Sequence, residues 1–420
     1  DAQIQIELWR FLNDPYAREF IDLKPRPKMP PDTTSWDTLR RVAQQDAVTR
    51  WLKRFFLQKN YKRVLEFYDG IEKVVGTLPP PLPRTLEHTF SKNERFVWRA
   101  TAQVYLGRNV REVISDLTKR IKTLETFLSR PMKEKIKDGE FGFRGHPAEV
   151  RLRRVIGIAY TTLGYGHTTL GEYRQAAQAY ASALRYLRDS GFHTQEAVTR
   201  NNLSRVLSEL GFVTRGLRIC RDALALKEKL GYENPIAYSH STLALIYNNG
   251  LQPENAWREA ALAVAYFRKL EERRGLGLAL LHLGEALRRL ATSTRLQADT
   301  PEQLFDTAEA AISEAVQIFD ESPESMRRIE VAIEQGCLYR DYMRSLGRNS
   351  SDSLNERFRR YKNRALNTLR RAVELAKKKG YPRHQLDAQV DLAWTYYYAG
   401  EIENAEKAIE ESLALVPDGC

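Results

Sequence analysis

The sequence predicts an all-α solenoid, a superhelix of antiparallel helix pairs stacked one after another. The first observation is a Leu–small doublet, such as Leu163-Gly164 or Leu283-Gly284, that recurs with a basic spacing of 40 residues. The second is a pair of small residues, seven apart, that follows each doublet: Ala176 and Ala183, Gly216 and Ala223, Ala256 and Ala263, Ala308 and Ala315, Ala365 and Ala372, Ala405 and Ser412. Self-similarity at a fixed period indicates units that bury their apolar faces by stacking on one another.

The first 35 residues are expected to form an N-terminal helix and a Pro-rich connector. Ile4, Leu8 and Phe11 fall on one helical stripe, and the prolines between Lys24 and Pro31 stop any helix. The chain begins with Asp1 rather than Met. We therefore expect a piece of a longer protein, with residues 1–35 as an arm or as the tail of an upstream domain.

Residues 36–147 are expected to hold two degenerate helical hairpins, or two plain ones. One has bulky residues from Val48 to Phe55, a turn at Lys59–Tyr61, and a second helix through Val64, Tyr68 and Ile71. The other runs from Trp98 to Tyr105, turns at Gly107–Asn109 and continues through Ile114 and Ile121. Both keep the bulky positions of the later repeats and lose the alanines.

Residues 148–420 carry six repeats of about 40 residues. Short turns are expected at Gly171–Tyr173, Leu251–Pro253 and Gly400–Ile402. Two repeats are longer, which predicts insertions near 292–301 and 346–353.

The six copies resemble the tetratricopeptide repeat (TPR), a helix–turn–helix unit with small residues where helices cross and bulky ones where pairs interlock. The resemblance covers roughly Ala148 to Val416, with a period of 40 instead of the usual 34. It implies a right-handed superhelix of about eight pairs, the first two degenerate, with a concave face that binds a partner.

Composition excludes several classes of function. The sequence lacks a G-x-x-x-x-G-K-[ST] loop, a long apolar run and a signal peptide. Its seven histidines are scattered, so we expect no metal, no cofactor and no enzyme. The three cysteines, Cys220, Cys337 and Cys420, are far apart, which favours inert thiols in a reducing cytoplasm.

The net charge of +12 is concentrated near the C-terminus. Between Arg344 and Arg383, 13 Lys or Arg residues stand against three acids. This basic patch could bind an acidic partner or nucleic acid, although a solvated helix face is the favoured interpretation. Its centre consists of Arg357, Arg359, Arg360, Lys362 and Arg364.

A TPR superhelix lines its concave side with one face of the first helix of each pair. Asn201, Asn202 and Arg205 form the sharpest cluster there, because amides and a guanidinium can hold a peptide backbone or a carboxylate. Trp394 and Tyr397 indicate a partner contact or a C-terminal cap. The full set of predicted groove residues is Tyr165, Asn201, Asn202, Arg205, Tyr238, Ser241, His282, Glu285, Trp394 and Tyr397.

The leading functional hypothesis is a non-enzymatic sensor module. The long repeats, degenerate first copies and Pro-rich connector resemble the C-terminal sensor region of bacterial STAND-class signal-transduction ATPases. That resemblance implies an upstream nucleotide-binding domain and an inducer on the concave face, expected to be a protein or peptide, with a small molecule as an alternative. The competing hypothesis is a stand-alone TPR scaffold, adaptor or peptide receptor. Neither needs nucleic acid or a membrane.

Overall fold

The computed structural model describes residues 61–76, 86–129, 148–231, 233–293, 301–321, 325–347 and 352–416, and every regular element within them is an α-helix. None of these helices is both long and apolar enough to cross a bilayer. The chain divides into two compact units. One comprises Asp1–Ala102 with Arg130–Phe141, and the other comprises Gln103–Ser129 with Gly142–Cys420. The predicted arm at 1–35 and the helix predicted at 48–55 lie outside the described residues.

In the first unit, α4 (Tyr61–Gly76) carries the second half of the first predicted hairpin. Val64 and Tyr68 of α4 are buried, as their bulky positions predict. From α5 (Leu86–Tyr105), the Arg99 guanidinium lies 4.8 Å above the centre of the Tyr68 ring. A cation over an aromatic face stabilises this contact.

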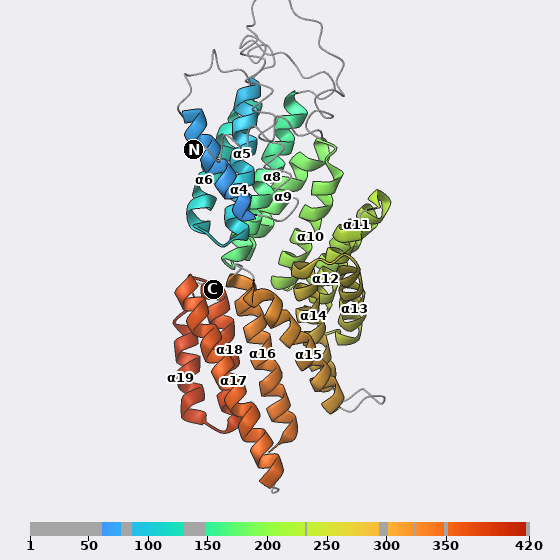
Figure 1. Cartoon of the computed structure of the whole chain (residues 1–420), viewed down its shortest axis with the longest axis vertical. Helices are drawn as coiled ribbons and strands as arrows, with labels where there is room; N and C mark the ends of the chain where they lie inside the picture. The colour runs from blue at the N-terminus through green and yellow to red at the C-terminus, as the bar shows by residue number, and fades with distance from the viewer. Residues whose placement is uncertain are drawn as a thin grey trace, which may run out of the picture. The chain divides into compact units, whose positions relative to one another are not determined.

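The second unit contains the end of α5, then α6 (Val110–Leu128) and six helix pairs in sequence order (Figure 1). The fold is the predicted TPR-like helical solenoid. The pairs are α8 (Ala148–Thr169) with α9 (Tyr173–Asp189), α10 (His193–Glu209) with α11 (Val213–Leu230), α12 (Glu233–Asn249) with α13 (Pro253–Lys269), α14 (Arg273–Ala291) with α15 (Pro301–Asp320), α16 (Ser325–Leu346) with α17 (Asp352–Lys379), and α18 (Pro382–Ala399) with α19 (Ile402–Leu413).

Local residue chemistry sets the helix ends. Gly231 and Gly400 follow α11 and α18 with φ of 69° and 76°, the left-handed conformation that glycine adopts most easily at a helix C-terminus. Pro253 and Pro382 occupy the first turns of α13 and α18, where the missing amide hydrogen costs nothing. The turns predicted at Gly171–Tyr173, Leu251–Pro253 and Gly400–Ile402 are confirmed.

The two helices of each pair meet through the small residue of the doublet. A Cβ atom on Gly284 would lie 2.4 Å from Cγ1 of Ile312, and one on Gly336 would lie 2.5 Å from Cγ of Leu369. These glycines therefore permit a close approach that any side chain would block. In the α10–α11 pair the small residue of the doublet is Ser204. The position on the second helix that holds Ile312 or Leu369 in those two pairs is here the smaller Cys220.

The fifth pair accommodates its extra residues mainly as helix. Ala365 lies 13 residues after the start of α17, whereas Ala176 lies three residues after the start of α9. The 28-residue α17 is therefore extended at its N-terminal end, and this extension carries Arg357, Arg359 and Arg360. The sequence predicted the insertion near 346–353; of those residues the structure describes Leu346 at the end of α16, Gly347, and the first two residues of α17.

Candidate functional site

Polar contacts join the first helices of successive pairs along the predicted groove. Asn201 of α10 donates from Nδ2 to Thr242 of α12 at 2.7 Å. Asn248 of α12 donates to the carbonyl oxygen of His282 in α14 at 3.0 Å. Further along, Arg288 of α14 bonds Glu334 of α16, and Arg340 of α16 bonds Asp391 of α18. The first helices of these successive pairs are therefore held together by polar side chains.

Several predicted groove residues take part in this packing. Asn201 is 7% exposed, and its Oδ1 accepts from Ser239 at 3.1 Å. Ser241 is 3% exposed, and Tyr238 donates to Glu272 at 2.9 Å while its ring packs edge-on against a buried phenylalanine. The assumption that packing leaves these positions free is wrong for these three residues.

Arg205 reaches a helix that lies 125 residues later in the chain. Its Nη2 lies 3.2 Å from Oε1 of Glu330 in α16. Two more side chains contact the same carboxylate. Nη1 of Arg327 lies 2.5 Å from Oε2 of Glu330, and Nε2 of His384 in α18 lies 3.5 Å from Oε1. We call Arg205, Arg327, Glu330 and His384 the groove cluster; it joins α10, α16 and α18 through one carboxylate.

Burial and neighbouring charges set the pKa values of the ionisable groups within and beside this cluster. Burial alone would raise the pKa of Glu330, but Arg327, His384 and Arg205 hold it well below its usual value. Glu330 is therefore an anion at neutral pH. His282 of α14 is 8% exposed, and burial lowers its pKa to about 4, so its ring is neutral.

The buried polar atoms without a hydrogen-bond partner in the described part of the chain include Nε of Arg205, Oδ1 of Asn248 and Nδ1 of His384. A buried polar atom with no partner costs about 1–3 kcal/mol, so such atoms are rare in folded proteins. All three atoms are covered by neighbouring protein atoms, so a ligand contacts them only if the surrounding side chains move.

The remaining predicted residues differ in what they contact. Asn202 is half-buried and makes no side-chain hydrogen bond to the described residues. Glu285 accepts from Asn248 at 3.1 Å and from Arg289 at 2.9 Å. The Tyr165 ring stacks on Tyr105, with ring centroids 4.5 Å apart.

The C-terminal aromatic residues form a cluster on α18. Trp394 and Tyr397 are 48% and 55% exposed, and their rings meet edge-on at 5.8 Å. Trp394 also stacks on Tyr398, and the Arg344 guanidinium covers the Tyr398 ring at 4.9 Å. Large exposed aromatic rings are typical anchors of protein interfaces.

Most of the predicted basic patch is paired with acids of neighbouring helices. Arg357 lies 2.5 Å from Glu302, Lys362 lies 3.0 Å from Glu401, and Arg364 lies 2.6 Å from Glu309. The charge that this surface presents is thus smaller than the sequence count suggests.

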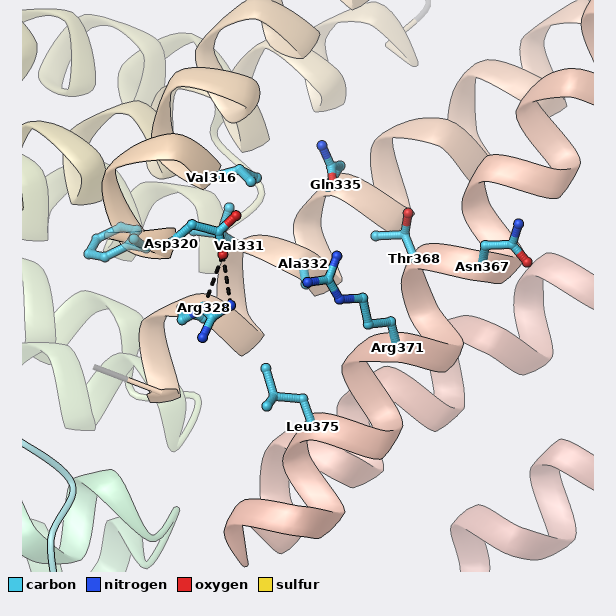
Figure 2. Close-up of a pocket in the computed structure, with 11 residues that line it drawn as sticks. Val316, Asp320, Arg328, Val331, Ala332, Gln335, Asn367, Thr368, Arg371 and Leu375 are labelled. Carbon is cyan, nitrogen blue, oxygen red and sulfur yellow. Dashed lines mark hydrogen bonds and ion pairs between the residues drawn. The ribbon is translucent and has the colours of Figure 1, made fainter. Parts of the chain in front are cut away.

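A small cavity of about 210 Å³ lies between α15, α16 and α17, apart from the predicted groove residues. Figure 2 shows Arg371 on one side and the ion pair of Asp320 with Arg328 on the other. None of the ten predicted groove residues lines it. In the described part of the chain, no three or more His, Cys, Asp or Glu residues are placed to hold a metal ion.

The sequence prediction missed Arg327, Glu330 and His384. Glu330 precedes the Gln335-Gly336 doublet by five residues, one helical turn earlier than the positions that were chosen as groove-facing. Extending the groove face by that turn would have found it. No sequence signal connects Glu330 to Arg205, because their contact depends on how far the solenoid winds.

Two solved structures share this fold at low sequence identity. A Rap protein complexed with competence and sporulation factor matches with a TM-score of 0.52 and 11% identity, over 89% of this chain and 98% of that chain. The apo form of RapI matches with a TM-score of 0.50 and 13% identity, over 77% and 97%. No family model and no curated protein sequence matches the chain. At such identities, the likeness shows the fold alone.

Proposed function

We propose that this chain is a non-enzymatic recognition module that binds a protein or peptide segment along its groove-facing helices. The observation that carries the proposal is that Asn202 and Arg205, three residues apart on α10, are both partly exposed, while the Asn202 amide and Nε of Arg205 make no hydrogen bond within the described residues. An extended peptide presents a carbonyl and an amide at every residue and could satisfy them. The Rap protein that shares this fold was solved in complex with competence and sporulation factor, which supports the proposal as an analogy of fold.

We further propose, from the resemblance in architecture, that the module is the sensor part of a bacterial STAND-class signalling ATPase or transcription regulator. Inducer binding would then release the upstream domains. The alternative is a free-standing adaptor or peptide receptor. The gene upstream of the Asp1 codon discriminates between them, because a phosphate-loop motif there supports the sensor and a start codon supports the adaptor.

The binding proposal is tested with peptides selected from a random displayed library on the purified chain. Asn202→Ala removes an amide with no structural hydrogen bond, and Arg205→Lys keeps a cation for Glu330 but removes Nε. We expect Arg205→Lys to weaken binding of the selected peptides by roughly ten- to a hundredfold, as for one lost hydrogen bond to a charged group, and Asn202→Ala to weaken it by roughly two- to tenfold, as for a neutral one.

The matched control is Trp257→Ala, which removes an exposed aromatic ring from α13. It should leave affinity unchanged. If Asn202→Ala and Arg205→Lys bind like the parent chain while Arg359→Glu with Arg360→Glu abolishes binding, recognition belongs to the basic patch and the proposal is wrong.

A further inference from the structure

The last helix pair carries an exposed apolar stripe on α19. Ile402, Ile409 and Leu413 are 49%, 49% and 64% exposed. Their spacing of seven and four residues places them on one side of the helix. Ala405 and Ala408 are buried and lie beside this stripe, on the face by which α19 packs in its own pair. The stripe therefore borders the packing face and extends it into solvent.

The repeat register shows what this stripe would do in an earlier pair. Ile409 lies four residues after the first small residue of its repeat, and its five counterparts are almost completely buried. They are Tyr180, Cys220, Ala260, Ile312 and Leu369, none more than 1% exposed. Part of this burial comes from the first helix of the same pair, as for Ile312 and Leu369. Part comes from the next pair, since Cys220 clusters with Leu243 and Ile246 of α12. Within the described residues Ile409 lacks the cover that a following pair supplies, and a solenoid end normally needs a polar outer face to stay in water.

The charges beside the stripe indicate what covers it. Glu403, Glu406 and Glu410 of α19 are exposed, and no ion pair holds them within the described residues. A second copy docked symmetrically would place these acids against one another, which is unfavourable. A partner that carries Lys or Arg beside an apolar stripe would pack on the stripe of α19 and pair with its acids.

We propose that α19 is a docking face for a helix of a partner protein with an apolar stripe flanked by basic residues. The partner helix stacks on the last pair in the place of the first helix of a further repeat. This surface is separate from the groove cluster, so it goes beyond the peptide binding proposed above.

The probe is a synthetic peptide with the sequence of α14, Arg273–Ala291, because α14 is an apolar first helix that contains four arginines and one glutamate. The comparison peptide has all four arginines replaced by glutamate. Fluorescence anisotropy with the full chain should show binding of the basic peptide, at least tenfold weaker binding of the comparison peptide, and weakening with added salt. Failure of the chain to bind the basic peptide, or equal binding of both, overturns the proposal.

Ile409→Glu should reduce basic-peptide affinity more than tenfold, and Glu406→Lys should weaken it and flatten its salt dependence. The matched control is Leu262→Glu, since Leu262 on α13 is 48% exposed and lies outside the stripe. It should bind like the parent chain, and so should Asn202→Ala, which separates this surface from the groove. Equal binding by Ile409→Glu and the parent chain would refute the assignment. Sedimentation that shows a dimer lost in Ile409→Glu would instead assign the stripe to a second copy.

Discussion

Lys227 of α11 is a buried amine that has no carboxylate partner in the described structure. It is 2% exposed, and its Nζ donates to Oγ of Ser239 at 2.7 Å. Ser239 in turn donates to Oδ1 of Asn201, so one predicted groove residue depends on a buried cation. Burial lowers the pKa of Lys227 to about 8, because the charged form loses its hydration.

We predict that Lys227→Met stabilises the protein at pH 7. Below pH 8 the folded and unfolded states both hold the proton, and the full cost of burying it, on the order of 3 kcal/mol, is present. From about pH 8 to the ordinary lysine value near 10.5, the unfolded state binds more protons than the folded state, so the stability of the parent rises with pH.

The check is urea unfolding of the parent and Lys227→Met at several pH values from 7 to 10. The difference in unfolding free energy should shrink as pH rises through that window. Lys229→Met, an exposed lysine on the same helix, serves as the control and should differ little from the parent at any pH. A difference for Lys227→Met that stays constant with pH would contradict the buried-charge explanation.

At the scale of the element, the size of the doublet residue and the size of its partner on the second helix compensate. Gly284 faces Ile312 and Gly336 faces Leu369, whereas Ser204 and Ala244 share their register with Cys220 and Ala260. The size of the doublet residue is therefore explained only together with the size of the side chain that it faces on the second helix of the pair.

We predict that Gly284→Ala destabilises the protein by about 1–3 kcal/mol, because the added Cβ would overlap the Ile312 side chain. Combined with Ile312→Ala, it should cost less than the sum of the two single changes, since the smaller side chain gives the Cβ room. The coupling energy, measured by urea unfolding of all four proteins, should be about 0.5–3 kcal/mol.

The control cycle combines Gly284→Ala with Leu369→Ala, which lies in the next helix pair. Those two changes should be additive. Additivity of Gly284→Ala and Ile312→Ala would show that the predicted steric contact does not limit stability.

The same size pattern explains why the helices were predictable and the groove was less so. Small residues at fixed spacing report contacts within one helix pair, and these depend on nearby sequence. The three turns predicted within pairs, at Gly171–Tyr173, Leu251–Pro253 and Gly400–Ile402, accordingly lie between the two helices of their pairs. Asn201 and Arg205 were selected as groove-facing, but their partners Thr242 and Glu330 belong to other pairs. Such contacts depend on the accumulated rotation of the solenoid, which no single repeat encodes.

At the scale of the whole molecule, the winding of the second unit brings distant pairs into contact. Glu330 of α16 forms ion-pair contacts with Arg205 of α10 and with His384 of α18. A Cβ on Gly171, in the turn after α8, would lie 2.4 Å from the side chain of Arg383 at the start of α18. The first and last of the six pairs therefore meet, and the groove cluster lies among residues that this winding brings together.

Removing the shared carboxylate should cost far more than removing one of its cations. Glu330→Gln leaves Arg205, Arg327 and His384 facing one another without an anion, and an uncompensated buried charge typically costs about 3–5 kcal/mol. Arg205→Ala leaves Glu330 paired with Arg327, so we expect a smaller loss. The pKa of Glu330 is held well below normal, so its contribution is fully present above about pH 4.5, the ordinary value, and is lost as pH falls below that.

These expectations are checked by urea unfolding at pH 7 and by small-angle scattering. Glu330→Gln should lower the unfolding free energy more than Arg205→Ala does, and it should increase the radius of gyration because the contact between α10 and α16 is lost. Glu403→Gln, on the exposed side of α19, is the control and should change neither quantity. If Arg205→Ala costs as much as Glu330→Gln, the single ion pair rather than the shared carboxylate holds the winding, and Arg327 and His384 contribute little to it.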